Sequence, residues 1–283
     1  MHKRRFRDEL GLDRPVVSDG HRAEPGVLRS APQAAPRAAV VVFAGPSISA
    51  EEIEAELDAH CLPPAAQGDV YRASLQRPLL IALIDGVFEQ VPAVWHKEIL
   101  WAMAQGIHVY GASSMGALRA AELAPFGMDG VGSIFEAYRD GRLEDDDEVA
   151  LAHGPAETAY AAFSEPLVNI RPTLQTAAAE RIIATATLRE LLQIGKQLFY
   201  PERSYARILE HGASRSLPES ELRALAAWLP GRQVDQKHDD ALSLLRVLRE
   251  RLAAGVEAKR VDFSFEWTSF WDRLVRSADR TPH

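Results

Sequence analysis

Three segments of the chain repeat one pattern, in which a short apolar run ends at a turn and an amphipathic stretch follows. The runs are AAVVVFAG at residues 38–45, PLLIALIDG at 78–86 and GIHVYGA at 106–112. Continuous apolar runs of this length are typical of strands covered on both faces. Strands that alternate with helices form parallel sheets. The sequence therefore predicts an α/β protein with a mostly parallel sheet flanked by helices.

The predicted helices follow these runs closely. Ser49 and Glu52 form a capping box at the start of a helix that runs to about His60. The second helix spans residues 92–106, opening at a proline and closing at a glycine. The third spans residues 114–127 and carries Gly and Ala on one face.

Beyond about residue 176 the strand signals stop, and the chain reads as successive amphipathic helices. Ser216 and Glu219 predict a second capping box there. The predicted helices cover residues 179–199, 201–212, 218–229 and 239–255.

These signals divide the chain into three predicted parts. Residues 1–37 mix charges with Pro, Gly and Ala without periodicity, which predicts a disordered leader. Residues 38–175 form the α/β core. Residues 176–283 form an all-helical domain, interpreted as a lid or partner-docking surface without chemistry of its own.

Composition excludes several classes of protein. A net charge of -8 argues against a nucleic-acid groove, which needs clustered Lys and Arg. Cys61 is the only cysteine, so an internal disulfide and a four-thiolate zinc site are impossible; we expect Cys61 to be a small buried residue. No apolar run approaches the roughly 18 to 20 residues of a membrane span, and none follows the basic first ten residues as a signal peptide requires. We therefore predict a cytoplasmic protein without a membrane partner.

The carboxyl ends of the strands locate the candidate site, because ligands of α/β sheets bind there. The loops at these ends are 45–47, 85–86 and 111–116, and we expect all three to share one edge. They contribute Gly45, Ser47 and Asp85 to a predicted pocket, to which we also assign Asp69.

The third loop reads Ala112-Ser113-Ser114-Met115-Gly116, which resembles the nucleophile elbow except for Ala at its first position. In such a turn the serine hydroxyl points out of the sheet, while the first N–H groups of the helix, here those of Met115 and Gly116, donate to an oxyanion. We expect Ser113 to help hold this oxyanion. Ser113 or Ser114 fits equally well as a helix N-cap.

A base for the serine is available on the preceding helix, in Trp95-His96-Lys97-Glu98. Lys97 can act only when neutral, which requires burial to lower its pKa from about 10.4. His96 needs less perturbation, since the pKa of histidine is already about 6.5. Both residues fit equally well as ordinary side chains at a helix surface.

Carboxylates offer two further possibilities. The run at residues 145–148, with His153 behind it, has the residue types of a metal site, but such runs are usually solvated, and we predict no metal. Asp69 and Asp85 are more suggestive, because a carboxylate at a sheet edge can orient a hydroxyl or an ammonium group. A turn at Asp85-Gly86 explains that aspartate equally well.

Taken together, an ordered set of segments from about residue 40 to 172 resembles the TfuA family. The segments are VVFAGPS (41–47), PPAAQGDV (63–70), IDGVF (84–88), AVWHKEIL (93–100), GASSMGALRAAEL (111–123), FGMDGVGSIFEAYRDG (126–141), DDEVALAH (146–153) and SEPLVNIR (164–171).

The resemblance implies a partner of YcaO-type enzymes, which use ATP to activate a peptide amide so that sulfur replaces its oxygen. It implies that the chain releases this sulfide by hydrolysing the C-terminal thiocarboxylate of a ThiS-like carrier protein, using a serine and a lysine. Matched by motif, these are Ser114 and Lys97, with Ser113 and Ser47 as rival serines. No cofactor is expected, since YcaO supplies the ATP chemistry and the chain has no phosphate loop.

Two functions remain open from the sequence. One is this accessory hydrolase of peptide thioamidation. The other is a non-catalytic adaptor that docks YcaO, the precursor peptide and the sulfur donor on the same loops. A general serine esterase is weaker, because no downstream acid and histidine of an α/β-hydrolase are identifiable.

Overall fold

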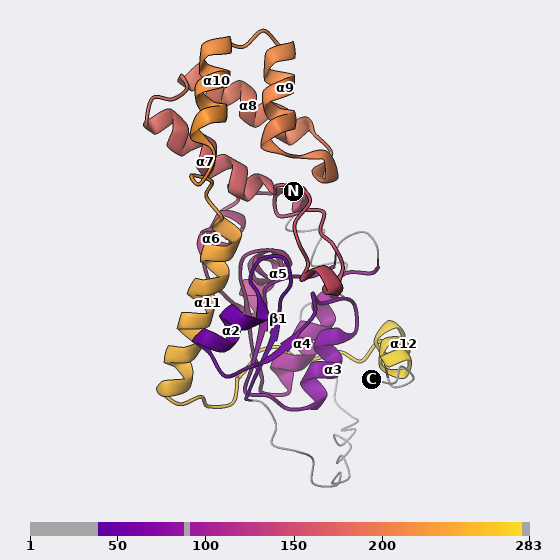
Figure 1. The fold of residues 1–283 in the computed structure, drawn as a ribbon. Coiled ribbons are helices and arrows are strands. Elements are labelled where there is room, and N and C mark those ends of the chain that lie inside the picture. Colours follow the sequence, from indigo (N-terminus) through magenta and orange to yellow (C-terminus); the bar gives the residue numbers. More distant parts are fainter. Residues whose placement is uncertain (1–38, 88–90, 279–283) are drawn as a thin grey trace, which may run out of the picture. The chain divides into compact units, whose positions relative to one another are not determined.

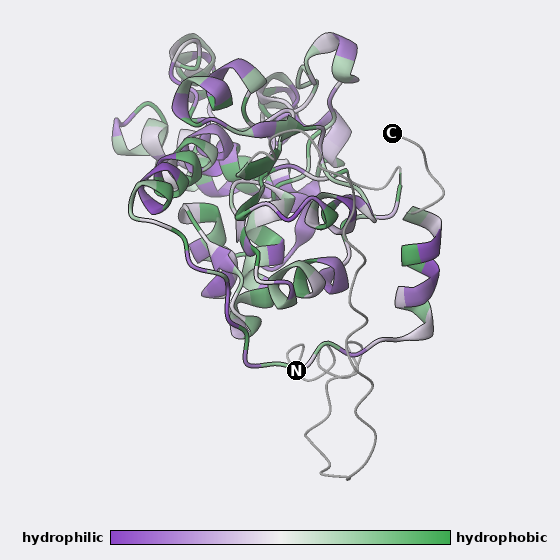
Figure 2. Cartoon of the chain, turned by 90° about the horizontal axis from the view of Figure 1, so that it is seen from below, coloured by the Kyte–Doolittle hydropathy of each residue, from purple (hydrophilic) through white to green (hydrophobic). Residues whose placement is uncertain are grey.

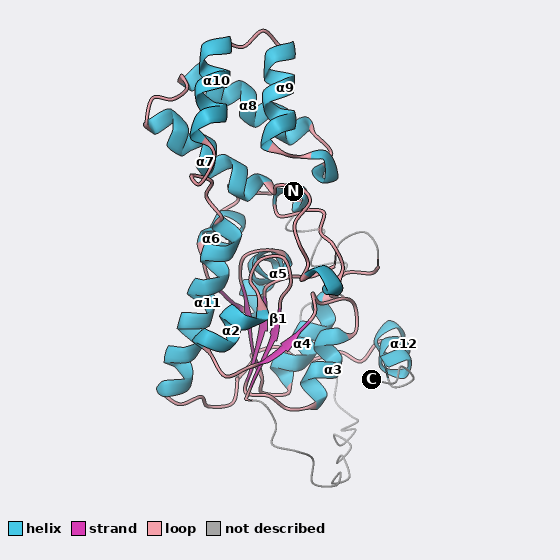
Figure 3. Ribbon diagram, in the orientation of Figure 1, coloured by secondary structure: helices cyan, strands magenta, loops and turns pink. Residues whose placement is uncertain are grey.

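The strands form one parallel sheet. In the computed structural model, which describes residues 39–87 and 91–278, five strands lie in the order β2-β1-β3-β4-β5, and every neighbouring pair is parallel. The strands, magenta in Figure 3, lie among helices. Their bounds are β1 Val40–Phe43, β2 His60–Leu62, β3 Leu80–Leu83, β4 His108–Gly111 and β5 Asp129–Gly130. The chain winds outward from β1 to β2, returns to β3 and then continues the other way. The predicted parallel α/β fold is confirmed, and its switch point lies between β1 and β3.

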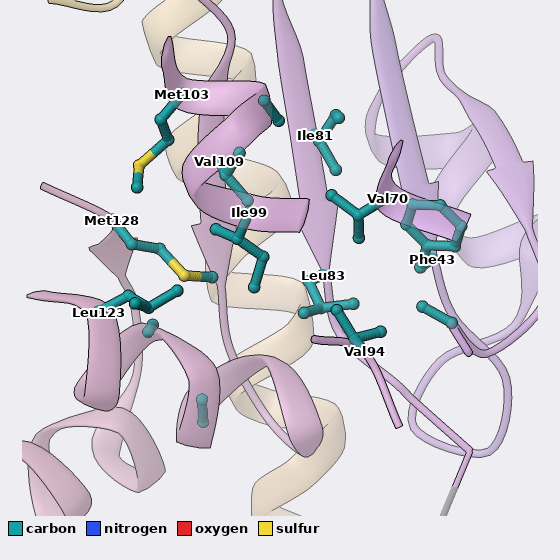
Figure 4. Close-up of a cluster of buried hydrophobic side chains, with 14 of the residues drawn as sticks. Phe43, Val70, Ile81, Leu83, Val94, Ile99, Met103, Val109, Leu123 and Met128 are labelled. Atoms are coloured by element: carbon teal, nitrogen blue, oxygen red, sulfur yellow. The ribbon is translucent and has the colours of Figure 1, made fainter. Parts of the chain in front are cut away.

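Helices cover both faces of this sheet, as the continuous apolar runs require. Alternate residues of the central strands point to opposite sides, so each run supplies both faces. One face packs against α3 (Asp69–Leu75), α4 (His96–Ala104), α5 (Met115–Leu123) and α6 (Ser133–Arg139), as the close-up in Figure 4 shows in part. The other packs against α2 (Ala50–Glu56) and α11 (Gln236–Ala253), which lie across the strands from α3 and α4 (Figure 1). The strand residues on the first face are Val41, Phe43, Ile81, Leu83 and Val109, and those on the second are Val40, Val42, Leu80, Ala82 and Tyr110.

The helices of the first half are α2 Ala50–Glu56, α3 Asp69–Leu75, α4 His96–Ala104, α5 Met115–Leu123 and α6 Ser133–Arg139. The capping box of α2 is confirmed: Ser49 Oγ accepts the N–H of Glu52 at 3.2 Å, and Glu52 accepts the N–H of Ser49 at 3.1 Å. The predicted opening of the second helix at Pro92 is wrong. That helix begins at His96, because Trp95 is extended and donates its N–H to Glu98.

The helical C-terminal region is also confirmed. It comprises α7 Leu167–Ala179, α8 Thr185–Gln197, α9 Tyr205–Ser214, α10 Glu219–Trp228, α11 Gln236–Ala253 and α12 Ser269–Ala278. Short 3-10 turns lie at Ala124–Phe126, Asp146–Glu148, Ala156–Thr158 and Tyr200–Glu202.

Two details of this region differ from the sequence prediction. The stretch 179–199 is not one helix, because the chain turns at Arg181, whose φ is +63°, before α8 begins. The Ser216 capping box is also wrong. Ser216 has a φ of +60°, and Pro218 holds the N-cap position of α10.

The last two helices return to the α/β core. Four apolar residues of α11 fill the second face of the sheet: Ala241, Leu244, Leu245 and Leu248. Green and purple residues alternate around α12 in Figure 2, and Trp271 is a buried apolar residue of this helix. Residues 38–283 form one unit, whereas the predicted leader at 1–37 lies outside the described residues. Among the helices described, none is long and apolar enough to cross a membrane.

Candidate active site

A buried carboxylate joins two of the three loops at the switch point. Asp85, which directly follows the β3 strand region, is 1% exposed. It accepts the N–H of Gly45 at 2.9 Å, the N–H of Ser47 at 3.0 Å and the hydroxyl of Ser47 at 2.6 Å. Gly45 and Ser47 therefore hold Asp85 in place, and the Ser47 hydroxyl is already engaged as a donor to the carboxylate.

A cavity of about 290 Å³ opens beside this carboxylate. It collects residues from the loops after β1 and β3, the start of α5, the segment 146–153 and the start of α11. The loops expected to share one edge do so, because the cavity joins Pro46, Asp85 and Ser114. The lining residues are Pro46, Asp85, Gly86, Val87, Ser114, Met115, Leu118, Asp146, Val149, Ala150, Leu151, Ala152, His153, Tyr200, Pro201 and Lys237.

The turn from β4 into α5 is strained. Ser113 has a φ of +66°, and the N–H of Ser114 donates to the carbonyl of Ala112 at 2.8 Å. This is a γ-turn with positive φ, a rare conformation that non-glycine residues adopt at a cost and that clusters at functional sites. Ser113 itself is fully buried, and its hydroxyl has no partner within the described residues.

The turn presents Ser114 to the cavity. The side chain of Ser114 makes no capping bond to α5, and within the described residues its hydroxyl has no hydrogen-bond partner. The geometry thus favours the elbow over the N-cap interpretation for Ser114. A hydroxyl that is held at a cavity wall without a partner is free to donate its proton to a base.

Two glycines allow α5 to start this close to the sheet. A Cβ at Gly116 would lie 1.6 Å from the carbonyl oxygen of Leu83, and one at Gly111 would lie 2.0 Å from the carbonyl oxygen of Gly116. Any larger residue at these positions would push the helix away from the strands. Gly116 therefore positions the serine.

Of the two N–H groups predicted to donate to an oxyanion, one already has an acceptor and the other has none within the described residues. The N–H of Gly116 donates to the carbonyl of Ile84 at 3.2 Å and is therefore occupied in this structure, so its role as a donor to an oxyanion stays a prediction. The N–H of Met115, in the first turn of α5, finds no acceptor within the described residues. Met115 thus remains a candidate donor.

Lys237 supplies an amine to the cavity and was not singled out from the sequence. Its side chain is 2% exposed, and its Nζ lies 3.2 Å from the carbonyl of Val149 and 3.8 Å from Asp85. Burial lowers the pKa of Lys237, while the charges of Asp85 and Asp235 oppose that shift. A signal was present in the sequence. Lys237 lies on the same helical stripe as Ala241 and Leu244, where a charged residue is unusual.

The structure places Lys97 and His96 elsewhere. Lys97 Nζ donates to the hydroxyl of Thr268 at 3.3 Å and lies 5.3 Å from the centre of the Phe265 ring. Burial lowers its pKa as well. Within the described residues, no hydrogen bond joins Lys97 to Ser114, and neither Lys97 nor His96 lines the cavity. His96 Nε2 lies 2.7 Å from the carboxylate of Glu122.

Asp69 is also separate from the cavity. Its carboxylate accepts the N–H of Ala66 at 2.7 Å and pairs with Arg72 on the next turn of α3. Both contacts are local, so Asp69 fixes the turn that enters α3.

The acidic run at residues 145–148 forms ion pairs with the helical region. Arg203, which is almost fully buried, donates to Asp147 at 2.9 Å. Arg171 donates to Glu148 through two bonds of 2.8 Å. These pairs fix the segment that walls the cavity, and within the described residues no group of acidic residues, His or Cys is arranged to hold a metal ion.

These features define a class: a doubly wound parallel α/β protein with a serine at a strained strand-to-helix turn, facing a cavity that holds a buried lysine. Residues 85–204 match the family model described as TfuA-like protein, which confirms the resemblance to the TfuA family over that range. The matched range includes Asp85, Lys97 and Ser114 but ends before Lys237. No curated protein matches the chain.

Proposed function

We propose that the chain is an accessory protein of YcaO-dependent peptide thioamidation that hydrolyses the C-terminal thiocarboxylate of a ThiS-like sulfur carrier. The reaction would take place in the cavity at the carboxyl edge of the sheet. The observation that carries the proposal is the joint placement of Ser114 and Lys237 on the walls of this cavity. A Ser–Lys pair is a known hydrolytic arrangement, and it needs a nucleophile and a desolvated amine in one pocket.

The geometry favours Lys237 over Lys97 as the base. Both lysines have a lowered pKa, but only Lys237 shares the cavity with the serine. Asp85 does not require a charged Lys237, because three N–H and O–H donors from the β1 loop already bind its carboxylate. A neutral amine beside a satisfied carboxylate is therefore chemically reasonable here.

The chemistry balances with these two groups and water. Neutral Lys237 takes the proton of Ser114 as its oxygen attacks the thiocarboxylate carbon, and the N–H of Met115 stabilises the resulting oxyanion. The C–S bond then breaks, and the lysine ammonium gives its proton to the sulfur, which leaves as hydrosulfide. Water hydrolyses the serine ester and releases the carrier carboxylate. No organic cofactor enters these steps.

The test is sulfide release in the absence of YcaO. Purified protein is given a ThiS-like carrier with a C-terminal thiocarboxylate, and sulfide is followed over time. We expect multiple turnovers with the native chain and with Ser220→Ala, an exposed serine of α10, and none with Ser114→Ala. Release at the uncatalysed rate by the native chain would reject the hydrolase and leave the adaptor function. In that case YcaO should also thioamidate the precursor peptide with free sulfide when Ser114 is replaced.

A further inference from the structure

We propose that His153 is a second proton-transfer residue of the cavity, the general base for the water that hydrolyses the acyl–Ser114 ester. This inference rests on the proposed hydrolase and assigns the step that Lys237 leaves open. His153 belongs to the segment 146–153, and it lines the same cavity as Ser114 and Lys237.

The hydrogen bond of the imidazole fixes which nitrogen can act as a base. His153 Nδ1 lies 2.8 Å from the carbonyl oxygen of Gly154. A carbonyl oxygen only accepts, so Nδ1 carries the proton of the neutral ring, and Nε2 carries the lone pair. A catalytic histidine needs this orientation, in which one nitrogen is held by an acceptor and the other is left for the substrate.

The ring and its backbone are held from several directions. Tyr160 packs against the imidazole edge-on, with ring centres 5.8 Å apart. His153 forms a bridge to Ala162, and the flanking N–H groups of Ala152 and Gly154 donate to Ser164 Oγ at 2.8 Å and to the carbonyl of Ala161 at 2.9 Å. A side chain that is fixed in this way lies on an ordered wall of the cavity.

The turn that brings Tyr160 back to His153 is itself strained. Ala159 and Tyr160 both have positive φ, 49° and 55°. Non-glycine residues adopt this region at an energetic cost, and they persist where the surrounding contacts require them. This strained turn holds the ring of Tyr160 against His153.

Lys237 and His153 differ in their access to solvent. Lys237 is almost fully buried, and its Nζ contacts the carbonyl of Val149, whereas His153 is only half-buried. The serine proton needs a desolvated base close to the sheet edge. The hydrolytic water must enter from solvent, so the more exposed wall is the place for its base.

In the proposed step, His153 Nε2 takes a proton from water as the water oxygen bonds to the ester carbon. The tetrahedral intermediate then breaks its bond to Ser114 Oγ, and that oxygen takes the proton from the imidazolium. The product is a carboxylic acid, which loses its own proton to solvent.

The matched variant is His153→Asn, because the asparagine amide can still donate to the Gly154 carbonyl but offers no basic nitrogen. With the thiocarboxylated carrier as probe, we expect a burst of one sulfide per protein, followed by turnover at least about 100-fold slower than that of the native chain. Intact-mass measurement should find the carrier bound to Ser114 as an ester that hydroxylamine releases. His60→Asn, at an exposed histidine of β2, is the control and should turn over normally.

Each outcome decides a separate point. Turnover by folded His153→Asn within about threefold of the native rate would overturn the proposal, as would slow turnover without the burst and the ester. His153→Gln serves as the second variant if the asparagine chain does not fold, and the same pattern is required of it. A native chain that releases no sulfide would reject the hydrolase as a whole, which these variants do not address.

Discussion

Two buried lysines stand at the starts of two helices and have opposite surroundings. Lys97, at the start of α4, contacts a hydroxyl and an aromatic ring from the segment that precedes α12. Lys237, at the start of α11, contacts a backbone carbonyl and a carboxylate beside the cavity. Burial lowers the pKa of both. A lowered pKa enables either lysine to act as a base, but only Lys237 shares its cavity with a nucleophile.

The region around Lys97 is built for packing. Trp271 of α12 is fully buried among aromatic rings, with centres 5.3 Å from Tyr71, 5.5 Å from Trp101 and 5.2 Å from Phe265. Two of these contacts are edge-on, an arrangement that aromatic pairs prefer, and the contact with Trp101 is tilted. This cluster ties α12 to α3 and α4.

The largest expected effect separates the two lysines directly. Lys237→Met should lower sulfide release about 100- to 10,000-fold, the usual contribution of a general base. Lys237→Arg should be as damaging, because a guanidinium cannot be deprotonated at accessible pH. Lys97→Met should remain within a few-fold of the native rate. The reverse ranking of the two methionine variants in a sulfide-release assay would return the catalytic role to Lys97.

The next effect is on stability and falls in the Lys97 region. Trp271→Ala should lower the free energy of unfolding by about 3 to 5 kcal/mol, the usual cost of removing a buried aromatic side chain. Phe270→Ala, at an exposed neighbour, is the control and should change little. Urea unfolding measures both. Sulfide release by folded Trp271→Ala should persist. If this variant kept native stability but released no sulfide, the aromatic cluster would belong to the catalytic machinery.

A pH effect on stability is expected in the same region. Burial raises the pKa of Glu98 to about 7, against the N–H groups of Gly68, Trp95 and Tyr71 that favour its charged form. Because the folded pKa exceeds the unfolded one, this group stabilises the fold fully below about pH 4.5 and loses that contribution as pH rises through 7. The contribution is on the order of 3 kcal/mol. Comparing the free energies of unfolding of the native chain and Glu98→Gln at pH 5 and pH 8 measures this contribution. If the two free energies changed equally between these pH values, the prediction would be contradicted.

The smallest effect concerns the support of the cavity. Ser47→Ala removes the 2.6 Å bond to Asp85 and should lower the free energy of unfolding by about 1 to 2 kcal/mol. Sulfide release should fall modestly, since Asp85 keeps two backbone donors. Complete loss of release by a folded Ser47→Ala chain would instead make Ser47 the acting serine, and the sulfide assay distinguishes the two.

Much of the fold could be predicted because strong local signals carried it. Uninterrupted apolar runs revealed β1, β3 and β4, and the Ser49–Glu52 pair marked the start of α2. The strands β2 and β5 were missed because they are only three and two residues long. Their positions depend on pairing with the central strands, which a single sequence does not display.

The site could be predicted only in part, for a related reason. The rule that ligands bind at the carboxyl ends of parallel strands brought Ser47, Asp85 and Ser114 together correctly. The lysine was sought on the helix nearest in sequence, which led to Lys97. Lys237 arrives from α11, and only the tertiary packing of that helix on the sheet reveals it. Where the three predicted parts of the chain divide stays a prediction.

The placement of α11 also governs how the chain matures during synthesis. The sheet face formed by Val40, Leu80 and Ala82 is covered by α11, whose last residue is Ala253. At ribosomal speed the stretch from β5 to this residue takes on the order of ten seconds to make. Chains stalled before residue 236 should therefore be cleaved readily in pulse proteolysis, and protection of such chains would contradict this. A nascent chain thus acquires the cover of its sheet and the lysine of its cavity in one late event, so an incomplete product has neither a stable body nor a working pocket.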